Sequence, residues 1–364
     1  MIRCDIAIVG AGMAGASLAA AIGDAARVVL IEGEGQPGYH ATGRSAAFWS
    51  ETYGGPAVQP LTSASGPKLA EGGFLHPRGG LHLADSSGEG ALAELRAEFA
   101  GTNVVLPPVE RAGLEAAVPG LRSGWDHGLA EPTCQDIDVA GLHAAYLRRA
   151  RAAGAILLCD AGVTAVAHEA AGWRIETRAG SVKTDILVDA AGAWAGRVAE
   201  LAGAALIGIQ PFRRTLVQIV VDPLVPAGLP LVMDALGRFY FKAEAGGRLW
   251  LSPHDETPVD PHDVAPEELD VAIAIDRLES VVDWRVVRRE RAWAGLRSFT
   301  PDRVPVYGFD RRVPGFFWCA GQGGFGIQTA PAAAAMAAAL LLGRSLPEWL
   351  SGVDAERYAP ERFN

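Results

Sequence analysis

The chain has only four cysteines in 364 residues, and they are widely scattered. No pair has the C-x-x-C spacing and no histidine stands at metal-ligand spacing from them, so no metal site is expected. A few separated cysteines in a chain of this size are typical of a reducing compartment. The four are Cys4, Cys134, Cys159 and Cys319.

An excess of positive charge and long apolar runs are also missing. The formal net charge of −10 argues against a nucleic-acid partner, because that affinity rests on clustered Lys and Arg. The longest uncharged apolar run, Ala330–Leu342, would span about 20 Å as a helix, short of the roughly 30 Å core of a bilayer. The first strand signal begins almost at once, which leaves no room for a signal peptide. We therefore expect a cytoplasmic protein, with a peripheral membrane contact left open.

Strand and helix signals alternate at the N-terminus. Ile6–Val9 is predicted as a strand, a helix is predicted from Gly12, and a second strand is predicted at Arg27–Glu32. This βαβ unit predicts a parallel sheet buried on both faces. The stretch Gly33–Gly90 is punctuated by Gly and Pro, and we predict it as loop-rich. Further predicted elements are helices at Ala91–Ala100 and Val139–Ala153, and a central parallel strand at Ile186–Ala190.

The last third repeats the opening pattern after an interruption. The runs "RRTLVQIVV" and "GRFYFKA" alternate in side-chain character and predict a separate antiparallel sheet. A buried strand, a Gly-rich turn and an Ala-rich helix are then predicted in the run "GFFWCAGQGGFGIQTAPAAAAMAAALLL". We predict an α/β protein whose nucleotide-binding domain comprises 1–50, 139–208 and 299–364. A second, mainly antiparallel domain with helices would comprise 51–138 and 209–298.

Gly10, Gly12 and Gly15 form a G-x-G-x-x-G motif between the first strand and the first helix. The first glycine permits a tight turn, the second lets backbone N–H groups approach a pyrophosphate, and the third allows close helix–strand packing. Glu32 follows 20 residues after Gly12, where a carboxylate accepts hydrogen bonds from ribose hydroxyls and repels a 2′-phosphate. The motif predicts a dinucleotide site that disfavours NADP. It does not by itself separate NAD from FAD.

Three further stretches favour FAD. They are "YHATGRSAAF" at 39–48, "VDAAGAWAG" at 188–196, and "WAGLRSFTPDRVPVYG" at 293–308 leading into "AGQGGFGIQTA" at 320–330. Together with the opening motif they resemble the FAD-dependent D-amino-acid oxidase/glycine oxidase/sarcosine oxidase superfamily over nearly the whole chain. The likeness is greatest to its D-arginine dehydrogenase-like D-amino-acid dehydrogenases. It implies a Rossmann-like FAD-binding domain of the glutathione-reductase type. The cofactor contacts expected are Gly10, Gly12, Met13, Ala14, Gly15, Glu32, Gly33, Thr42, Gly43, Arg44, Ser45, Ala46, Val163, Ala191, Gly192, Trp194, Gly323, Gly324, Phe325, Gly326, Ile327 and Gln328.

The second Gly-rich turn also makes physical sense unaided. FAD is long, so its ring system ends far from the first glycine loop and needs a second cradle. The turn at Gly323–Gly326 precedes a helix whose positive N-terminus can stabilise the negative charge of a reduced flavin. Because the loop Arg297–Pro301 contains no cysteine for a covalent link, we expect non-covalent FAD.

The resemblance also implies a substrate site. Arg214 and Arg297 match family positions that hold a carboxylate, for which the planar fork of arginine is well suited. On a strand, Arg213 would point away from Arg214, so only one of the two can enter the cavity. The alternative for Arg297 is an ion pair with Asp302 that closes the domains.

Aromatic residues complete the expected site, together with Gly324 on the flavin side. Tyr240 matches a tyrosine that binds the substrate carboxylate, although a tyrosine between Arg238 and Lys242 is more often half-exposed packing. Tyr53 matches a mobile lid tyrosine, and "ETYGGP" has the composition of a loop.

Two departures from the D-arginine enzymes bear on specificity. Phe48 replaces a histidine, and Gly80 stands where an acidic residue would contact a guanidinium. An unpaired buried cation costs several kcal/mol, so we expect poor activity on D-arginine and a preference for an apolar or aromatic side chain.

The predicted activity is FAD-dependent oxidative deamination of a D-amino acid to a 2-oxo acid and ammonia, by hydride transfer from Cα to flavin N5. Oxygen or a quinone- or dye-type acceptor would take the electrons. The alternatives are oxidation of an N-alkyl or cyclic amino acid or a 2-hydroxy acid, and an NAD-dependent or non-catalytic nucleotide-binding protein. The stretch "SPHDETPVDPHD" at 252–263 has His and Asp residues, but a polar loop is favoured over a metal site.

Overall fold

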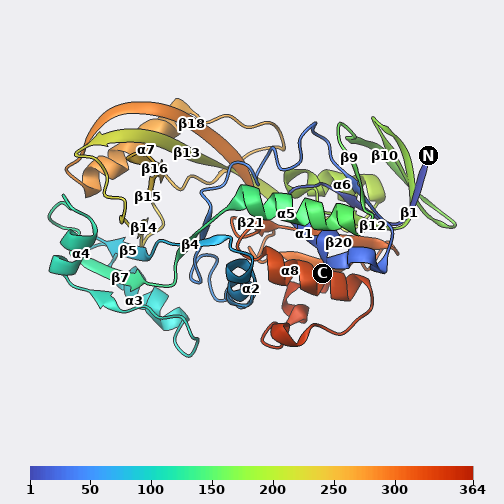
Figure 1. Cartoon of the computed structure of the whole chain (residues 1–364), viewed down its shortest axis with the longest axis horizontal. Coiled ribbons are helices and arrows are strands. Elements are labelled where there is room, and N and C mark those ends of the chain that lie inside the picture. Colours follow the sequence, from blue (N-terminus) through green and yellow to red (C-terminus); the bar gives the residue numbers. More distant parts are fainter. Residues whose placement is uncertain (364) are drawn as a thin grey trace.

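The computed structural model describes residues 1–363. The chain forms two lobes that lie side by side in Figure 1, one built on a mostly parallel sheet and one on a largely antiparallel sheet. Helices cover the first sheet and lie at the outer end of the second. The helices of the described residues are α1 (Met13–Ile22), α2 (Gln59–Glu71), α3 (Glu89–Glu98), α4 (Arg111–Ala117), α5 (Val139–Ala152), α6 (Ala195–Ala202), α7 (Glu268–Val281) and α8 (Ala330–Leu341).

The sheet of the first lobe has the strand order β10-β11-β12-β1-β2-β9, with β20 joined to β12 and β19 to β20. β1 runs parallel to both β2 and β12, which confirms the predicted βαβ unit and the predicted central strand. The fold class predicted from the sequence is therefore confirmed. The strands are β1 (Ile2–Val9), β2 (Val28–Ile31), β9 (Ile156–Leu158), β10 (Val163–Glu169), β11 (Gly172–Thr177), β12 (Gly180–Asp189), β19 (Val306–Phe309) and β20 (Phe316–Ala320).

The second lobe is organised by two long strands, β13 and β18, which pair antiparallel along most of their length. The strand order is β21-β18-β13-β16-β15-β14-β5-β7-β6, with β17 on β13, and the β14–β5 pair is parallel. The strands are β5 (Gly80–Ala84), β6 (Pro108–Val109), β7 (His127–Glu131), β13 (Gln210–Asp222), β14 (Leu231–Asp234), β15 (Tyr240–Glu244), β16 (Arg248–Ser252), β17 (Thr257–Pro258), β18 (Arg285–Phe299) and β21 (Gln322–Gly323).

A small third sheet joins β3 (Phe48–Trp49), β8 (Gln135–Ile137) and β4 (Leu75–Pro77). It sets the aromatic residue Phe48 opposite Asp136.

The prediction of loop for Gly33–Gly90 was wrong in its second half, which contains α2, β4 and β5. The buried face of α2 includes Thr62, Ser65 and Gly66, so it lacks the apolar periodicity that reveals a helix. Pro67 lies inside the helix and removes one backbone donor. Tertiary packing compensates, because a Cβ on Gly66 would come within 2.8 Å of the ring of Trp49.

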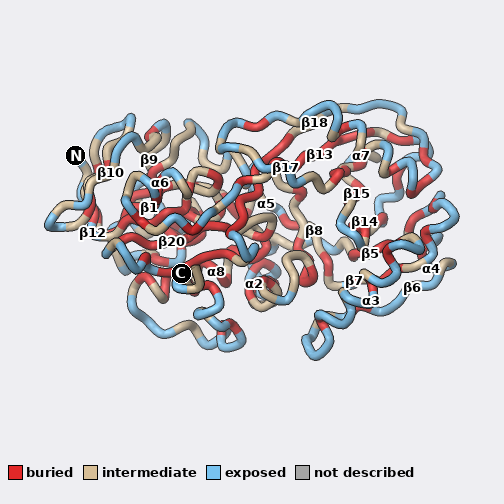
Figure 2. The backbone as a smooth tube through the Cα atoms, turned by 180° about the vertical axis from the view of Figure 1, so that it is seen from behind, coloured by how far each residue is buried: buried red, intermediate tan, exposed pale blue. Residues whose placement is uncertain are grey.

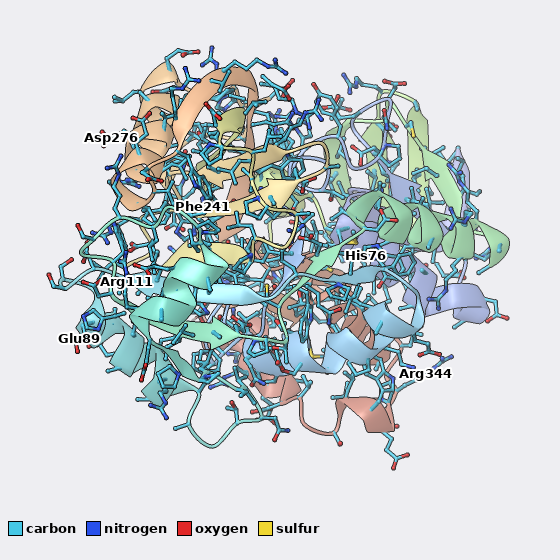
Figure 3. All side chains as sticks on the ribbon, turned by 60° about the vertical axis from the view of Figure 1, so that its left-hand side comes forward. His76, Glu89, Arg111, Phe241, Asp276 and Arg344 are labelled. Atoms are coloured by element: carbon cyan, nitrogen blue, oxygen red, sulfur yellow. The ribbon has the colours of Figure 1, made fainter. Side chains whose placement is uncertain are left out.

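Buried residues follow the central strands of the first lobe in Figure 2, and the core there joins β1, β12 and β20 to α1 and α8. A second core fills the other lobe, and Figure 3 shows Phe241 inside it while Arg111 and Asp276 lie at its outer side. The Ala-rich α8 packs on the first sheet with most of its residues buried. Across residues 1–363, every helix is too short or too polar to cross a membrane.

Candidate active site

The first glycine motif brings three backbone segments into close contact. Gly10 has φ +98°, and a Cβ there would lie 2.4 Å from the carbonyl oxygen of Ala190 at the end of β12. A Cβ on Gly15 would lie 1.9 Å from the carbonyl oxygen of Gly10. Both contacts are with backbone atoms, which cannot turn aside, so β1, α1 and β12 meet only because these positions lack side chains.

The start of α1 is open toward a ligand. Its N-cap is Gly12, which has no side chain to cap the helix. The backbone N–H of Met13 donates to Thr42 Oγ1 at 3.0 Å, so the loop after β2 is fastened to the same helix end. The remaining N–H groups of the first turn and the positive end of the helix suit a phosphate group.

Glu32 is held in place at the end of β2. Its Oε2 accepts a hydrogen bond from the backbone N–H of Ala11 at 2.9 Å, and its Oε1 accepts one from Glu34 at 3.1 Å. Each oxygen keeps a lone pair for a ribose hydroxyl, which fits the role predicted for this carboxylate.

We expect Glu32→Gln to raise the Kd for FAD about tenfold. The NH2 group of glutamine would face one of the two backbone N–H donors, and two donors cannot form a hydrogen bond with each other. Titration of the apoprotein with FAD, followed by flavin fluorescence, measures this. Glu71→Gln, on the surface beside Lys68, is the control. Equal Kd values for wild type and Glu32→Gln would contradict the assignment.

An open cavity runs from this carboxylate to the second glycine turn. A neighbouring cavity shares several of its residues and adds Gly33 and Val163 from the predicted set. The predicted residues that line the main cavity are Gly10, Gly12, Met13, Ala14, Glu32, Thr42, Ser45, Ala191, Gly192, Trp194, Arg297, Gly323, Gly324, Gly326 and Ile327.

Other predicted contacts have side chains that are engaged elsewhere. Arg44 pairs with Asp263 at 2.5 Å. Gln328 donates to the carbonyl oxygen of Tyr53, and Phe325 packs against the ring of the same tyrosine. Gly15, Gly43 and Ala46 also lie outside the lining of both cavities. Contacts from these residues to a cofactor stay predictions.

The second glycine turn resembles the first in having no room for side chains. Gly323 has φ +53°, and a Cβ there would lie 2.3 Å from the ring of Phe299. A Cβ on Gly324 would lie 2.4 Å from the hydroxyl of Tyr53. The turn therefore has no room for side chains at these two positions, and it lies close to Tyr53.

Arg214 and Arg297 approach each other from paired strands. In the register of β13 and β18, Phe212 faces Arg297 and Arg214 faces Gly295, so the two arginines are diagonal neighbours. Arg213 lies on the other face, where it pairs with Asp270 of α7 at 2.8 Å. The two adjacent arginines therefore lie on opposite faces of β13, as expected.

Arg297 is a buried cation without an acidic partner. Its side chain is buried, and it donates only to the carbonyl oxygens of Leu296 and Arg44, at 3.3 and 3.2 Å. Burial lowers the pKa of its guanidinium, and the nearby Arg214 adds to this. Asp302, the alternative partner, pairs instead with Arg362. Within residues 1–363 the charge of Arg297 is thus uncompensated, and an anionic ligand would compensate it.

Arg214 is also buried, at 1% exposure, but it has partners. Its Nε donates to the carbonyl oxygen of Asp255, and its Nη2 donates to Glu256 Oε1, both at 2.8 Å. Burial acts to lower the pKa of this guanidinium, but Tyr53, Tyr240 and the two acids outweigh it and the pKa rises. The side chain stays charged at any working pH.

Aromatic rings close the space between the two arginines. Phe48 lies with its centroid 5.1 Å from Tyr53 and 5.8 Å from Tyr240. The half-exposed alternative for Tyr240 was wrong, because the side chain is buried and burial raises the pKa of its hydroxyl. Local propensity could not predict this, since the burial comes from residues distant in the sequence, among them Phe48 and Leu216.

A buried network that was not predicted supports the segment before Tyr53. The carboxylate of Glu131, with no exposed surface, accepts hydrogen bonds from Ser50 Oγ, Thr52 Oγ1 and His82 Nε2 at 2.7–3.0 Å. Burial acts to raise the pKa of Glu131, but the hydrogen-bonded His82 and hydroxyls outweigh it and the pKa falls. The segment leading to Tyr53 is thereby fixed. No local pattern marks Glu131.

The residues His254, Asp255 and Glu256 were also missed as site residues. The stretch that holds them drew attention as a metal candidate, yet residues 1–363 contain no cluster of three or more metal-ligating side chains. They lie beside Arg214 instead.

The chain matches the family model for FAD dependent oxidoreductases over residues 5–340. It belongs to this family of FAD-dependent oxidoreductases. This match confirms the predicted superfamily and FAD as its cofactor, and it disfavours NAD.

The chain is similar to curated proteins with different names. Glycine oxidase of Pseudomonas aeruginosa is 28% identical, with 98% of each chain covered. The hydrogen cyanide synthase subunit HcnC of the same species is 28% identical over 258 residues, 70% of this chain. The matched region spans only 60% of the length of that subunit.

Solved structures share the fold across the whole chain. The glycine oxidase of Geobacillus kaustophilus superposes with a TM-score of 0.85 at 23% identity, covering 99% of this chain and 98% of that one. The L-proline dehydrogenase of P. horikoshii gives the same TM-score and identity, covering 100% and 98%. These likenesses establish the arrangement of the two lobes.

Proposed function

We propose that this protein is a cytoplasmic D-amino-acid dehydrogenase or oxidase of the D-arginine dehydrogenase-like branch, acting on apolar or aromatic substrates. The uncompensated charge of Arg297, beside Arg214, carries the proposal. A substrate carboxylate would supply the missing anion to this pair, with the Tyr240 and Tyr53 hydroxyls completing its hydrogen bonds.

The cavity residues fit an elongated cofactor such as FAD, since one open cavity joins Glu32 and the first glycine turn to Gly323 and Gly324 of the second. Gly10, Gly12 and Glu32 would hold the nucleotide end, and Gly323 and Gly324 would hold the ring system. When bound, FAD supplies the two-electron acceptor for the hydride from the substrate Cα. Tyr53 and Phe48 exclude water and orient the substrate over the turn.

Non-covalent binding is part of the proposal. None of the four cysteines lines the cavity. Cys319 is buried in β20, and burial raises the pKa of its thiol to about 12. A thiol that stays protonated is a poor nucleophile toward a flavin methyl group.

The expected preference for an apolar or aromatic side chain depends on the surroundings of Gly80 and Phe48. Gly80 packs against Cys134 and Glu131. A Cβ on Gly80 would lie 3.1 Å from the Cβ of Cys134 and 3.2 Å from the Cβ of Glu131. No acid stands at this position to pair with a substrate guanidinium. Phe48 and Tyr240 offer apolar surface instead.

We expect D-phenylalanine to be oxidised with a kcat/KM at least about a hundredfold above that of D-arginine, since a buried unpaired cation is strongly destabilising. The purified protein should be yellow and bleach anaerobically on addition of substrate. A panel of D- and L-amino acids, with a dye or oxygen as acceptor and with keto acid and ammonia measured, provides the test. D-arginine or D-lysine as the best substrate would overturn the specificity.

The same panel tests the second candidate, oxidation of an N-alkyl or cyclic amino acid or a 2-hydroxy acid. The fold likeness to L-proline dehydrogenase and glycine oxidase favours including it. Sarcosine, glycine, L-proline and D-lactate are the probes. Turnover of one of these with none for D-amino acids would replace the first proposal. Ready turnover with oxygen would mark an oxidase rather than a dehydrogenase.

A further inference from the structure

His254 has a strained backbone beside Arg214 and Tyr240. It lies in the loop between β16 and β17 with φ +54°, a left-handed conformation that a non-glycine residue rarely adopts. Its backbone N–H donates to Ser252 Oγ at 3.1 Å, which helps to hold the turn. Strain of this kind persists where the surrounding structure uses the side chain.

The imidazole has a defined tautomer. Nδ1 lies 2.7 Å from the carbonyl oxygen of Gly237, which can only accept, so Nδ1 carries the proton. In the neutral ring Nε2 then bears a lone pair. Across residues 1–363, Nε2 has no hydrogen-bond partner, and it is not closed off from the adjoining space.

The ring stands among the residues proposed to hold the substrate. Its centroid is 5.7 Å from that of Tyr240 and 6.5 Å from that of Tyr53. Burial lowers the pKa of His254 to about 3, and the cations Arg214, Arg303 and Arg277 contribute. The imidazole is therefore neutral throughout the working pH range and acts as an acceptor rather than a base.

The two carboxylates beside Arg214 are already engaged. The carboxylate of Asp255 accepts from the N–H and the hydroxyl of Thr215, at 2.6 and 3.0 Å. Glu256 Oε1 is shared by Arg214 and Arg303, at 2.8 and 2.6 Å. A substrate amine held beside the arginine pair needs an acceptor for its N–H groups, and His254 Nε2 is available.

We propose that His254 Nε2 accepts a hydrogen bond from the α-amino group of the substrate and so orients the nitrogen lone pair. This rests on the proposed function. In the reaction the Cα–H bond breaks and its electron pair leaves as hydride, while the lone pair of the neutral amine forms the C=N bond. The N–H proton is then lost to water. Fixing one N–H aligns the lone pair with the breaking bond.

His254→Asn is the deletion variant, because asparagine tolerates the left-handed backbone and its amide NH2 can replace Nδ1 on Gly237. It lacks an acceptor at the position of Nε2. His254→Gln restores an acceptor there. His262→Asn, in the loop after β17 and with Nδ1 bound to the backbone oxygen of Asp260, is the matched control.

For the best D-amino acid we expect His254→Asn to lower kcat/KM about tenfold, the effect of one hydrogen bond left unmade. His254→Gln should recover most of it and His262→Asn should match wild type. Binding of 3-phenylpropionate, which has the carboxylate and no amine, should change less than twofold, as measured by the shift of the flavin spectrum.

The pH dependence of kcat provides a second test, because the direction of its change is predicted. An ammonium N–H donates a stronger hydrogen bond than an amine N–H, so the acceptor raises the pKa of the bound amine. Removing it should move the acid limb of kcat to lower pH, by about 0.7 pH units.

Unchanged kinetics in His254→Asn, or equal losses of affinity for D-phenylalanine and 3-phenylpropionate, would overturn the inference. If wild type binds amino acids but oxidises none, the proposed function fails. The comparison of the two ligands still decides the role of His254, so the two failures are distinguishable.

Discussion

Replacing Arg297 by methionine is expected to lower kcat/KM for the D-amino acid by about a hundredfold or more, without loss of bound flavin or of stability. A charge-assisted, largely buried carboxylate contact is worth about 2–5 kcal/mol when one partner is truncated. In the free protein Arg297 contacts only two backbone carbonyls. Its removal leaves no orphaned acid, and methionine relieves a buried charge.

Arg213 supplies the opposite control one residue from Arg214. It pairs with Glu267 and Asp270 on the far face of β13. Arg213→Met should therefore lower the melting temperature and leave kcat/KM within about threefold. Glu267 and Asp270 lose their partner on the far face, while Asp255, whose carboxylate lies 3.8 Å from Arg213 Nε, stays hydrogen-bonded to Thr215. Steady-state kinetics and thermal unfolding of both variants check the pattern.

Arg297→Lys separates charge from shape. Lysine keeps the cation but loses the planar fork that binds both carboxylate oxygens, so an intermediate loss is expected. If Arg297→Met melts far below wild type while kcat/KM holds, the residue is structural and the carboxylate assignment is wrong.

The parts of this fold that the sequence predicts are those with a local physical cause. The βαβ unit follows from buried strands and from Gly15, whose absent side chain lets α1 pack against the end of β1. The opposite directions of Arg213 and Arg214 follow from the two-residue repeat of a strand. In each case neighbouring residues decide the outcome.

The parts that escaped prediction depend on distant residues. α2 uses small polar residues on its buried face because Trp49 and α8 pack against it. His254 and Glu256 enter the site only through the loop that crosses β13. Long-range contacts of this kind leave no periodicity in the sequence.

Asp189 is a third case, because this acid lies within the predicted central strand Ile186–Ala190. The residue ends β12 with its side chain completely buried. Oδ1 accepts the N–H of Ala191 at 3.1 Å, and Oδ2 has no partner within residues 1–363. Burial raises the pKa of this carboxyl to about 8.

Asp189→Asn is accordingly expected to flatten the dependence of stability on pH. The folded-state pKa of about 8 lies above the ordinary value of 3.8, so the folded protein holds a proton that the unfolded chain releases. Wild-type stability therefore falls as pH rises from about 4 to 8, by up to about 5 kcal/mol at 1.36 kcal/mol per pH unit. Asparagine stays neutral and keeps an oxygen for Ala191.

Melting temperatures of flavin-loaded wild type and Asp189→Asn between pH 5 and 8.5 measure this difference. Groups common to both proteins cancel, and the buried thiol of Cys319, with a pKa of about 12, does not titrate in the range. The gap between the two proteins should widen steadily with pH in favour of the variant. Parallel curves would mean that Asp189 is ionised in the fold, and that an unseen cation or water compensates its charge next to the Gly10 turn.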